Sequence, residues 1–539
     1  MTLDDFRRMN SNIARRFEVF TGIAISLIVL LLVGFRLTNA GALWRDECAI
    51  VQLARMPDVG SIFANFSHEA FPPPFSLLIR GWTNCFGYSD AALRCYGFAV
   101  AVLLTGGLWV VFRNLGAGVP LLSLAWVGLS ATFLVWGTSV RGYGIGTFFI
   151  VLVFGLIRQL MLKPTKWTAI ACTLAGLVSM QFLVQNAVLL AAIAVAAAAV
   201  SLSRREWRIA LVAAAAITIS LLSFLPYVNS YLHAAGWSVV VQPSDSRSSA
   251  AQQLTQFFGG PLAAAMCVIV LVGVVALAVV QLLRLRDKSE FPLDFIVYCC
   301  LGAFLSVIGS EVFFRLLNYA RQPWYSLAPL SLALVAADAV AAVSFQSNLL
   351  RLTRLGLAIA MVTLLAWTNW PRLMERQTNI DVVAKLVGDR AGNDDLIVVN
   401  PWQLGIPFSW YYQGPARWIT LPQLEEHRVH RYDLIKEKMM SPTAVDDVMD
   451  LVSATLRSGG RLWLVGGARF SPKPTPPLPP APNSPFGWDN VAYTRSWSQQ
   501  LGSFIQLHGG KGENVQLPQD LPVNPLEHVP LAEVEGWKP

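Results

Sequence analysis

The residues of this chain best suited to chemistry are two adjacent carboxylates, Asp46 and Glu47, in the segment Trp44-Arg45-Asp46-Glu47. They follow a long apolar run over 18–37, and charged side chains at the end of a membrane crossing are costly and usually functional. A carboxylate placed there can act as a general base toward a hydroxyl or amine. Asp46 and Glu47 are therefore the predicted catalytic residues. The alternative is that they only cap the helix that follows, because Asp is a favoured N-cap.

The same polar stretch continues to His68 and Glu69 and then to the triple proline Pro72-Pro73-Pro74, which fixes the backbone. His68 and His233 are the two histidines of the apolar part of the chain, and both fall in loops. With Glu69 they could bind a divalent metal ion, because imidazole and carboxylate are ordinary ligands. No ligand spacing supports this metal site, so two exposed loop histidines are the alternative.

Arginine and tyrosine side chains form a third group with a shared chemistry. Arg141 and Tyr143 stand at the start of the fourth apolar run, and Arg315, Arg321 and Tyr325 surround the loop between the ninth and tenth. A guanidinium group matches two phosphate oxygens at once, so these five residues are the predicted donor phosphate-binding set. The alternative is that the arginines are anchors that snorkel to the lipid headgroups.

The composition places these residues in a membrane protein. Of the 539 residues, 54% are hydrophobic and 14% are charged, whereas a soluble domain carries about 25% charged residues. Runs of about 20 apolar residues can cross a bilayer as helices. They predict a polytopic α-helical protein with about eleven transmembrane helices, or up to thirteen, at 18–37, 92–113, 119–136, 142–160, 167–184, 186–203, 209–228, 261–283, 293–313, 323–345 and 355–370. The shorter run 75–87 is predicted to be an interfacial helix.

The cations predict the orientation, because Lys and Arg favour cytoplasmic loops. With the N-terminus inside, alternate short loops carry the basic clusters, among them Arg15-Arg16, Arg204-Arg205 and Arg351 with Arg354. The loops 38–91 and 229–260 and the whole chain after 370 then lie outside. We expect a multi-pass protein of the cytoplasmic (inner) membrane, with membrane lipids and no nucleic acid among its partners.

The chain changes character after residue 370. Residues 371–470 hold two strand-like runs, 395–400 and 461–466, around a helical pattern, which predicts a small extracytoplasmic α/β domain. Residues 471–539 are predicted to be a proline-rich connector and tail. The glycine pair in Val465-Gly466-Gly467 is too short to cradle a phosphate, so no nucleotide cofactor is expected. Four aromatic residues are interpreted as a surface that docks on the membrane half, with sugar stacking as the alternative: Trp402, Trp410, Tyr411 and Tyr412.

Several of these motifs resemble one known superfamily. Trp44-Arg45-Asp46-Glu47, the proline cluster Phe71-Pro72-Pro73-Pro74-Phe75 and Arg94 resemble the first outer loop of GT-C glycosyltransferases. In pattern, the chain is similar to the protein mannosyltransferase-like group that uses dolichyl-phosphate mannose and to the lipid A aminoarabinose transferases. Arg141-x-Tyr143 and Pro323-Trp324-Tyr325-x3-Pro329 also match motifs of that group. The resemblance covers about residues 15–370, that is, the predicted transmembrane domain 1–370.

The resemblance implies roles for particular residues. It implies an aspartate in the first outer loop that activates the acceptor, matched by Asp46, and a polyprenyl-phosphate sugar donor held by basic and tyrosine side chains. It also implies a second important outer loop after the seventh span, where the apolar runs place 229–260. Some members bind a divalent metal between these loops, which Glu69 and His233 would hold here. Many relatives have His-Pro-Pro where this chain has Phe71-Pro72-Pro73.

The predicted function is therefore an inverting glycosyltransferase outside the cytoplasm. It would move a hexosyl or pentosyl group from a polyprenyl-phosphate donor to a lipid, glycan or protein acceptor of the cell envelope. Two alternatives stay open. One is a transporter or flippase of lipid-linked sugars, for which charged residues within several spans and inverted halves are typical. The other is a non-catalytic subunit of envelope assembly.

Overall fold

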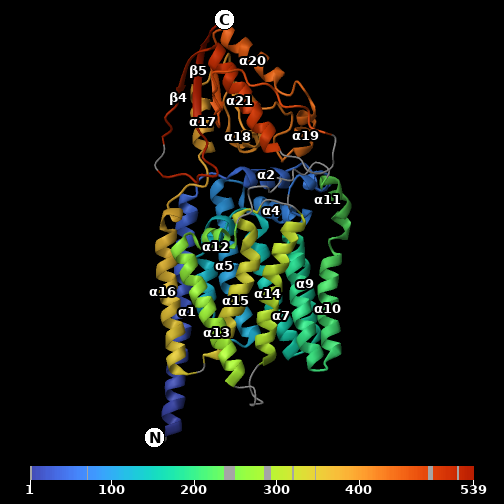
Figure 1. Ribbon diagram of the computed structural model, residues 1–539, viewed down its shortest axis with the longest axis vertical. Helices are drawn as coiled ribbons and strands as arrows, with labels where there is room; N and C mark the ends of the chain where they lie inside the picture. The colour runs from blue at the N-terminus through green and yellow to red at the C-terminus, as the bar shows by residue number, and fades with distance from the viewer. Residues whose placement is uncertain are drawn as a thin grey trace.

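The protein has two parts stacked end to end, a long bundle of helices and a smaller domain of strands and helices (Figure 1). The computed structural model describes residues 3–69, 71–235, 249–284, 293–317, 321–345, 347–482, 490–518 and 521–539. The N-terminus lies at the far end of the bundle, and the smaller domain covers the opposite end (Figure 1). The predicted combination of a polytopic helical membrane part with a small C-terminal sheet domain is confirmed.

The bundle is built from chain segments that run up to residue 373. In chain order its helices are α1 (Leu3–Asn39), α2 (Arg45–Ala54), α3 (Val59–Asn65), η1 (Phe66–His68), α4 (Pro73–Phe86), α5 (Asp90–Leu115), α6 (Leu121–Gly128), η2 (Phe133–Gly137), α7 (Gly142–Leu162), α8 (Lys166–Phe182), α9 (Asn186–Ser203), α10 (Trp207–Leu222), η3 (Leu225–Tyr227), α11 (Val228–Ala235), α12 (Ala250–Phe258), α13 (Pro261–Arg284), α14 (Leu293–Leu316), η4 (Pro323–Ser326), α15 (Leu327–Ser344) and α16 (Asn348–Leu373).

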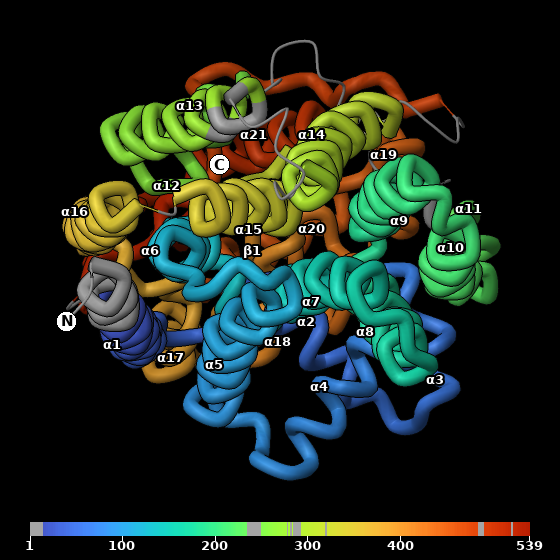
Figure 2. Tube along the Cα trace, turned by 90° about the horizontal axis from the view of Figure 1, so that it is seen from below, coloured from blue at the N-terminus to red at the C-terminus, as the bar shows by residue number. Residues whose placement is uncertain are grey.

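The predicted number of spans is not confirmed. Among the described residues, eight helices are long and apolar enough to cross a membrane, or nine if the bent pair Ala250–Phe258 and Pro261–Leu277 is one span. The apolar run 119–136 is not one continuous helix, because α6 ends at Gly128 and the π-helical segment η2 begins at Phe133. All of α6 is buried, and it is enclosed by α1, α5, α15 and α16 (Figure 2). Hydropathy alone cannot separate such a buried segment from a lipid-facing span.

Helix α4 corresponds to the predicted interfacial helix. It begins at Pro73, and proline is suited to the first helical turn because that turn leaves its N–H groups without helical partners. Together with α2 it lies at the end of the bundle, directly below the smaller domain (Figure 1). The first loop, 38–91, and the C-terminal domain therefore share one side of the membrane whichever way the chain is inserted. Of the predicted second loop 229–260, residues 236–248 lie outside the described residues.

The C-terminal domain is a sheet of five strands in the order β2-β1-β3-β5-β4. Strand β1 is parallel to β2 and β3, and β5 is antiparallel to β3 and β4. The elements of the domain are α17 (Ile380–Arg390), β1 (Leu396–Val399), η5 (Trp402–Leu404), α18 (Gly405–Tyr411), β2 (Arg417–Thr420), α19 (Tyr432–Met440), α20 (Asp446–Arg457), β3 (Leu462–Val465), α21 (Asn490–His508), β4 (Gly509–Asn514) and β5 (Leu531–Trp537).

The sheet extends beyond the predicted domain boundary at residue 470. Strands β4 and β5 and helix α21 come from the segment 471–539, which we had predicted to be a connector and tail. Strand β4 reads Gly-Gly-Lys-Gly-Glu-Asn, so it lacks the alternation of apolar and polar residues that identifies a strand. It forms the edge of the sheet, where pairing with β5 holds it in place.

The aromatic residues of α18 dock the C-terminal domain on the bundle. The Tyr411 hydroxyl donates a hydrogen bond to Asp90 Oδ1 (2.7 Å) and accepts one from the N–H of Leu43 (2.8 Å). The guanidinium of Arg55 lies 5.1 Å from the ring centroid of Trp410. The docking interpretation is confirmed for these two aromatic residues. Trp402 and Tyr412 instead contact side chains within their own domain.

Candidate active site

The two adjacent carboxylates of the first loop have different environments. Helix α2 begins at Arg45, and the Glu47 carboxylate turns back to accept the N–H of Trp44 (3.2 Å). It also accepts the N–H of Val140 (2.8 Å) and pairs with Arg94 (2.8 Å), and it is fully buried. Glu47 therefore takes the capping role that sequence left as an alternative. Asp46 instead lines a cavity.

Asp46 faces a cavity of 270 Å³ between the first loop, the bundle and the C-terminal domain. One of its carboxylate oxygens lies 3.0 Å from Nε of Arg45 and 3.5 Å from Nε2 of His430. The other lies 3.7 Å from a guanidinium nitrogen of Arg141. The lining residues are Trp44, Arg45, Asp46, His68, Glu69, Trp136, Arg141, Tyr143, Gln322, Trp324, Tyr325, His430, Tyr432, Leu526 and Glu527.

Glu69 holds two of these cations in place. Its Oε2 lies 2.7 Å from a nitrogen of Arg141, and its Oε1 lies 2.8 Å from Nδ1 of His430. Arg141 also donates to the backbone carbonyl of Asp46 (2.9 Å), and its guanidinium lies over the ring of Phe71, 4.5 Å from the centroid. The result is a compact arrangement of alternating charge, in which every cation touches at least one carboxylate.

Burial and charge set the protonation of this arrangement. Burial disfavours the ionised form of Asp46, but the guanidinium groups of Arg45 and Arg141, with His430, outweigh it and hold the pKa of Asp46 well below its usual range. Burial likewise opposes protonation of His430, yet Glu69 and Asp46 raise its pKa to about 9. At neutral pH the cavity therefore contains an ionised aspartate beside a protonated histidine.

Arg45 and Glu527 close the side of the cavity next to the C-terminal sheet. Glu527 precedes β5, and one of its oxygens lies 3.6 Å from a guanidinium nitrogen of Arg45. Burial raises the pKa of Glu527 to about 7; the charge of Arg45 lowers it and that of Asp46 raises it further. This carboxyl group thus changes charge near neutral pH, whereas Asp46 does not.

An aromatic wall forms another side of the cavity. Trp44, Trp136 and Trp324 make a cluster in which ring centroids lie 4.7–5.5 Å apart, and the ring of Tyr143 lies 6.0 Å from that of Trp324. The indole nitrogens of Trp44 and Trp324 are buried and have no hydrogen-bond partner among the described residues. Buried polar atoms nearly always find a partner, so both N–H groups are available to a ligand.

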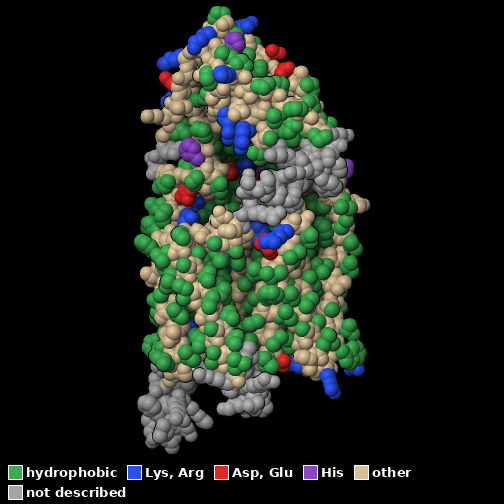
Figure 3. Space-filling model, in the orientation of Figure 1, with side chains coloured by type: hydrophobic (Ala, Val, Ile, Leu, Met, Phe, Trp, Pro, Cys, Tyr) green, Lys and Arg blue, Asp and Glu red, His purple; other side chains and the backbone are tan. Residues whose placement is uncertain are grey.

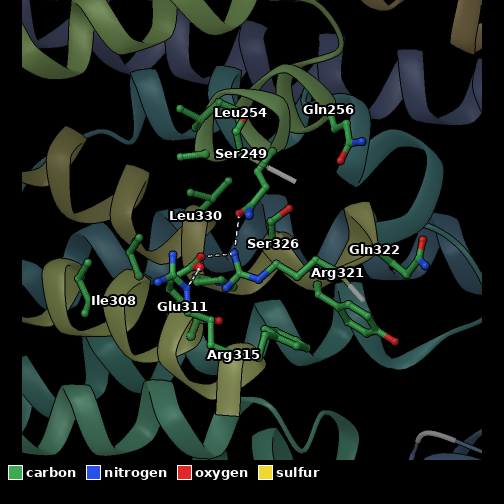
Figure 4. A pocket seen from close by; sticks show the side chains of 17 residues that line it. Ser249, Leu254, Gln256, Ile308, Glu311, Arg315, Arg321, Gln322, Ser326 and Leu330 are labelled. Atoms are coloured by element: carbon green, nitrogen blue, oxygen red, sulfur yellow. Dashed lines mark hydrogen bonds and ion pairs between the residues drawn. The ribbon is translucent and has the colours of Figure 1, made fainter. Parts of the chain in front are cut away.

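The predicted phosphate-binding residues divide between two neighbouring cavities. Arg141, Tyr143 and Tyr325 line the cavity of Asp46. Arg315 and Arg321 line a larger one of 480 Å³, where both bind Glu311 at 2.6 Å (Figure 4).

The two cavities are adjacent because Gln322 and Tyr325 line both. The larger cavity has a mostly apolar lining, which includes Leu254, Ile308 and Leu330 (Figure 4). A polar cavity and an apolar one thus meet at a shared wall.

The predicted metal ligands do not come together as a metal site. Glu69 uses one carboxylate oxygen on Arg141 and the other on His430, and His233, on α11, is exposed. His68 lines the cavity, with its Nδ1 3.9 Å from Asp433. No group of three or more His, Cys, Asp or Glu side chains suited to a metal occurs in the described part of the chain. The residues as arranged do not fit a divalent metal.

Sequence reasoning did not identify His430 and Glu527. Both come from the C-terminal domain and reach the cavity only because that domain docks on the bundle. His430 lies in His427-Arg428-Val429-His430, which has no known ligand spacing. The aromatic residues of α18, which we did interpret as a docking face, were the available signal that some part of this domain would lie against the first loop.

Two solved structures of one protein are similar to this chain. No family model matches the chain, and no curated protein matches it. Among solved structures, ArnT from Cupriavidus metallidurans is similar in its apo state (13% identity, TM-score 0.47) and bound to undecaprenyl phosphate (14% identity, TM-score 0.46). Each comparison covers 83% of this chain and 92% of the other.

Proposed function

We propose that the protein is a membrane glycosyltransferase that transfers a sugar from a polyprenyl-phosphate donor to an acceptor in the cell envelope. The observation that carries this proposal is the ionised carboxylate of Asp46, which lines one cavity together with Arg45, Arg141 and His430. A carboxylate can take a proton from the acceptor, and cations can stabilise the phosphate that leaves. Both requirements of the reaction meet in one cavity.

The reaction is a single displacement at the anomeric carbon of the donor sugar. The acceptor hydroxyl or amine forms the new bond, and the bond between the anomeric carbon and the phosphate oxygen breaks. Asp46 orients the acceptor and receives its proton. Because the cations keep the pKa of Asp46 low, the proton moves only once the attacking atom carries positive charge. Polyprenyl phosphate leaves with the bonding electron pair, and the configuration of the sugar is inverted.

The departing phosphate gains negative charge that the cavity can stabilise. Arg141 and His430 are cationic, and Nε of Arg141 is buried without a hydrogen-bond partner among the described residues. The buried indole N–H groups of Trp44 and Trp324 add two neutral donors. Donors fixed in advance in a cavity that excludes water are the usual source of such stabilisation.

The adjacent apolar cavity suits the hydrocarbon part of the donor. Its apolar residues lie next to Tyr325, so a prenyl chain there would place its phosphate toward the cavity of Asp46. Arg321, already paired with Glu311 and Gln253 (2.6 and 2.7 Å), would contact a phosphate only after exchanging a partner. We assign Arg141 the main phosphate contact, because its buried Nε has no hydrogen-bond partner among the described residues, and we assign Glu47 the positioning of α2.

The intramembrane charges favour an enzyme over a transporter of lipid-linked sugars. Asp338, within α15, pairs with Arg354 of α16 (2.7 Å) and accepts the hydroxyl of Ser123 (2.8 Å). All three residues are buried and satisfied by one another, as expected of a structural cluster. This cluster ties α6, α15 and α16 together and leaves Asp338 buried, so that this carboxylate cannot carry a substrate.

Reconstituted protein tests the proposal directly. Proteoliposomes would receive polyprenyl-phosphate sugars labelled in the sugar, together with envelope lipids and glycans as acceptors. Release of polyprenyl phosphate and appearance of label in an acceptor are expected, and both should depend on Asp46. Movement of intact donor across the bilayer without cleavage would contradict the proposal and support a flippase.

A further inference from the structure

A further cavity, of 630 Å³, lies in the C-terminal domain. It is lined by residues that directly follow strands β1 and β3, namely Asn400 and Gly466-Gly467, and by Thr494 from the start of α21. Strands β1, β2 and β3 are parallel, and open sheets of parallel strands bind ligands outside the carboxyl ends of the strands. The cavity is thus at the end of the sheet where a ligand site is expected.

Asn400 gives this cavity a fixed hydrogen-bond acceptor. Its side-chain nitrogen donates to the carbonyl of Gly467 (2.7 Å) and to Oγ of Ser498 (2.9 Å). These two bonds determine the orientation of the amide, so the other end must be the oxygen. That Oδ1 is buried and has no hydrogen-bond partner among the described residues, and Asn400 is only 4% exposed.

Two further polar atoms in the cavity lining are buried and unpaired in the same way. Oε1 of Gln403 and Oγ1 of Thr494 are also buried without a partner among the described residues. An unpaired buried polar group costs free energy, and this cavity has three such groups in its lining. Two of the three are amide oxygens, which only accept hydrogen bonds. The matching ligand therefore carries several O–H or N–H groups.

Arginine side chains in the cavity lining indicate the charge of the matching ligand. Arg469 and Arg495 are exposed residues of the lining, and Arg45 lines its inner side. Lys and Arg side chains gather on this face of the C-terminal domain, above a hollow at its junction with the bundle (Figure 3). Guanidinium groups favour phosphate and carboxylate. The ligand chemistry is thus a polyhydroxylated molecule with an anionic group.

The turn after β3 argues against a nucleotide as this ligand. The N–H of Gly466 donates to the carbonyl of Pro530 (2.8 Å), so it cannot point at a phosphate. A side chain at Gly466 would meet the carbonyl oxygen of Asn400 at 1.9 Å. The glycine is therefore needed for close packing of the chain, whereas a phosphate loop needs free N–H groups.

Arg45 lies between two cavities. This arginine lines both the cavity of Asp46 and the cavity of Asn400. Its guanidinium contacts the carboxylates of Asp46 (3.0 Å) and Glu527 (3.6 Å). A ligand in the C-terminal cavity therefore ends next to the predicted general base. This is the position that an acceptor occupies, since the donor enters from the apolar side.

We infer that the cavity at the carboxyl ends of β1 and β3 binds an anionic saccharide and presents it as the acceptor to Asp46. The acceptor role rests on the proposed function, whereas saccharide binding can be measured without it. Amide oxygens of Asn400 and Gln403 accept hydrogen bonds from sugar hydroxyls, and Arg469 and Arg495 bind the phosphate or carboxylate.

Titration calorimetry on the full-length protein in detergent tests the inference, with glucose 6-phosphate, glucuronic acid, glucose and inorganic phosphate as probes. At least one anionic sugar should bind more tightly than both glucose and inorganic phosphate. A preference between the two sugars identifies phosphate or carboxylate as the anion. Thr494→Val and Arg495→Gln should each weaken binding about tenfold, the effect of losing one hydrogen bond or charged contact.

Two controls separate this inference from the proposed function. Arg417→Gln changes an exposed arginine at the other end of the parallel strands and should leave sugar binding unchanged. Asp46→Asn should abolish donor cleavage and retain sugar binding. The inference is overturned if neither anionic sugar exceeds glucose and phosphate, or if Thr494→Val and Arg495→Gln bind as the wild type does. A protein that binds the anionic sugar but does not cleave the donor would contradict the proposed function and leave the sugar-binding inference intact.

Discussion

Nδ1 of His430 lies 2.8 Å from Oε1 of Glu69, and this contact joins the C-terminal domain to the first loop across 361 residues of chain. The same imidazole lies 3.5 Å from Asp46 through its other nitrogen. The domain therefore does more than cover the bundle, because it supplies a cation to the cavity that contains the predicted base. Activity and docking of the domain should accordingly respond together to changes at His430.

Asp46→Asn should lower donor cleavage by about 100-fold or more, the typical contribution of a general base. The substitution keeps the size of the side chain but removes the anion between Arg45, Arg141 and His430, so the thermal unfolding temperature should also fall, and activity is compared on the folded protein. Release of polyprenyl phosphate and tryptophan fluorescence during heating measure the two effects. Activity within a factor of two of the wild type would remove Asp46 from its role.

Glu47→Gln should lower stability without a separate loss of catalysis. Glu47 is fully buried against Arg94, and removing one partner of a buried ion pair costs about 3–5 kcal/mol. We therefore expect a lower unfolding temperature, and activity that falls in proportion to the folded fraction at each temperature. If the specific activity of the folded protein drops as far as in Asp46→Asn, then Glu47 takes a direct part in the chemistry.

The stability of the domain contact should decrease at alkaline pH. The folded pKa of His430 is about 9, above the ordinary value of about 6.5 for an unfolded chain. The contribution of protonated His430 to the free energy of unfolding is therefore fully present below pH 6.5, and it is lost as the pH rises toward and through 9. The unfolding temperature of the wild type should fall across this range. His430→Gln should remove that component, while a change at the exposed His528 should not.

Titration of Glu527 should make the stability of the protein depend on pH in a second, lower pH range. Its pKa is about 7 in the folded protein and 4.5 in the reference state. The folded protein thus binds more protons between these values, so stability falls as the pH rises from 4.5 to 7. Glu527→Gln should abolish this slope and leave the alkaline one intact. Equal slopes in the variant and the wild type between pH 4.5 and 7 would show that Glu527 is not the titrating group.

Much of the bundle and of the first loop could be predicted from the sequence, because the signals there are local. Apolar runs predict α1, α5, α7 and most later spans, and the short motif around Asp46 directly follows the first of them. The buried helix α6 could not be separated from a span, since its neighbours, not its hydropathy, decide that it is enclosed.

The contributions of the C-terminal domain could not be predicted in the same way. His430 and Glu527 reach the cavity through packing between distant segments, and neither lies in a pattern that indicates a partner. Strand β4 has no apolar residue, so its place in the sheet depends on β5 alone. Sequence patterns report the faces of single elements, whereas these features depend on how elements meet.

Metal removal gives the last prediction. A divalent ion held by Glu69 and His233 would have to displace both Arg141 and His430 from the Glu69 carboxylate. Each of these contacts is short, buried and charge-assisted, so the exchange is unfavourable. Treatment with EDTA should therefore change donor cleavage by less than about a factor of two, while Glu69→Gln should reduce it at least tenfold, because Arg141 and His430 lose the anion between them. Glu425→Gln, an exposed change on the C-terminal domain, is the matched control. Inactivation by EDTA that added zinc or magnesium reverses would show instead that Glu69 binds a metal.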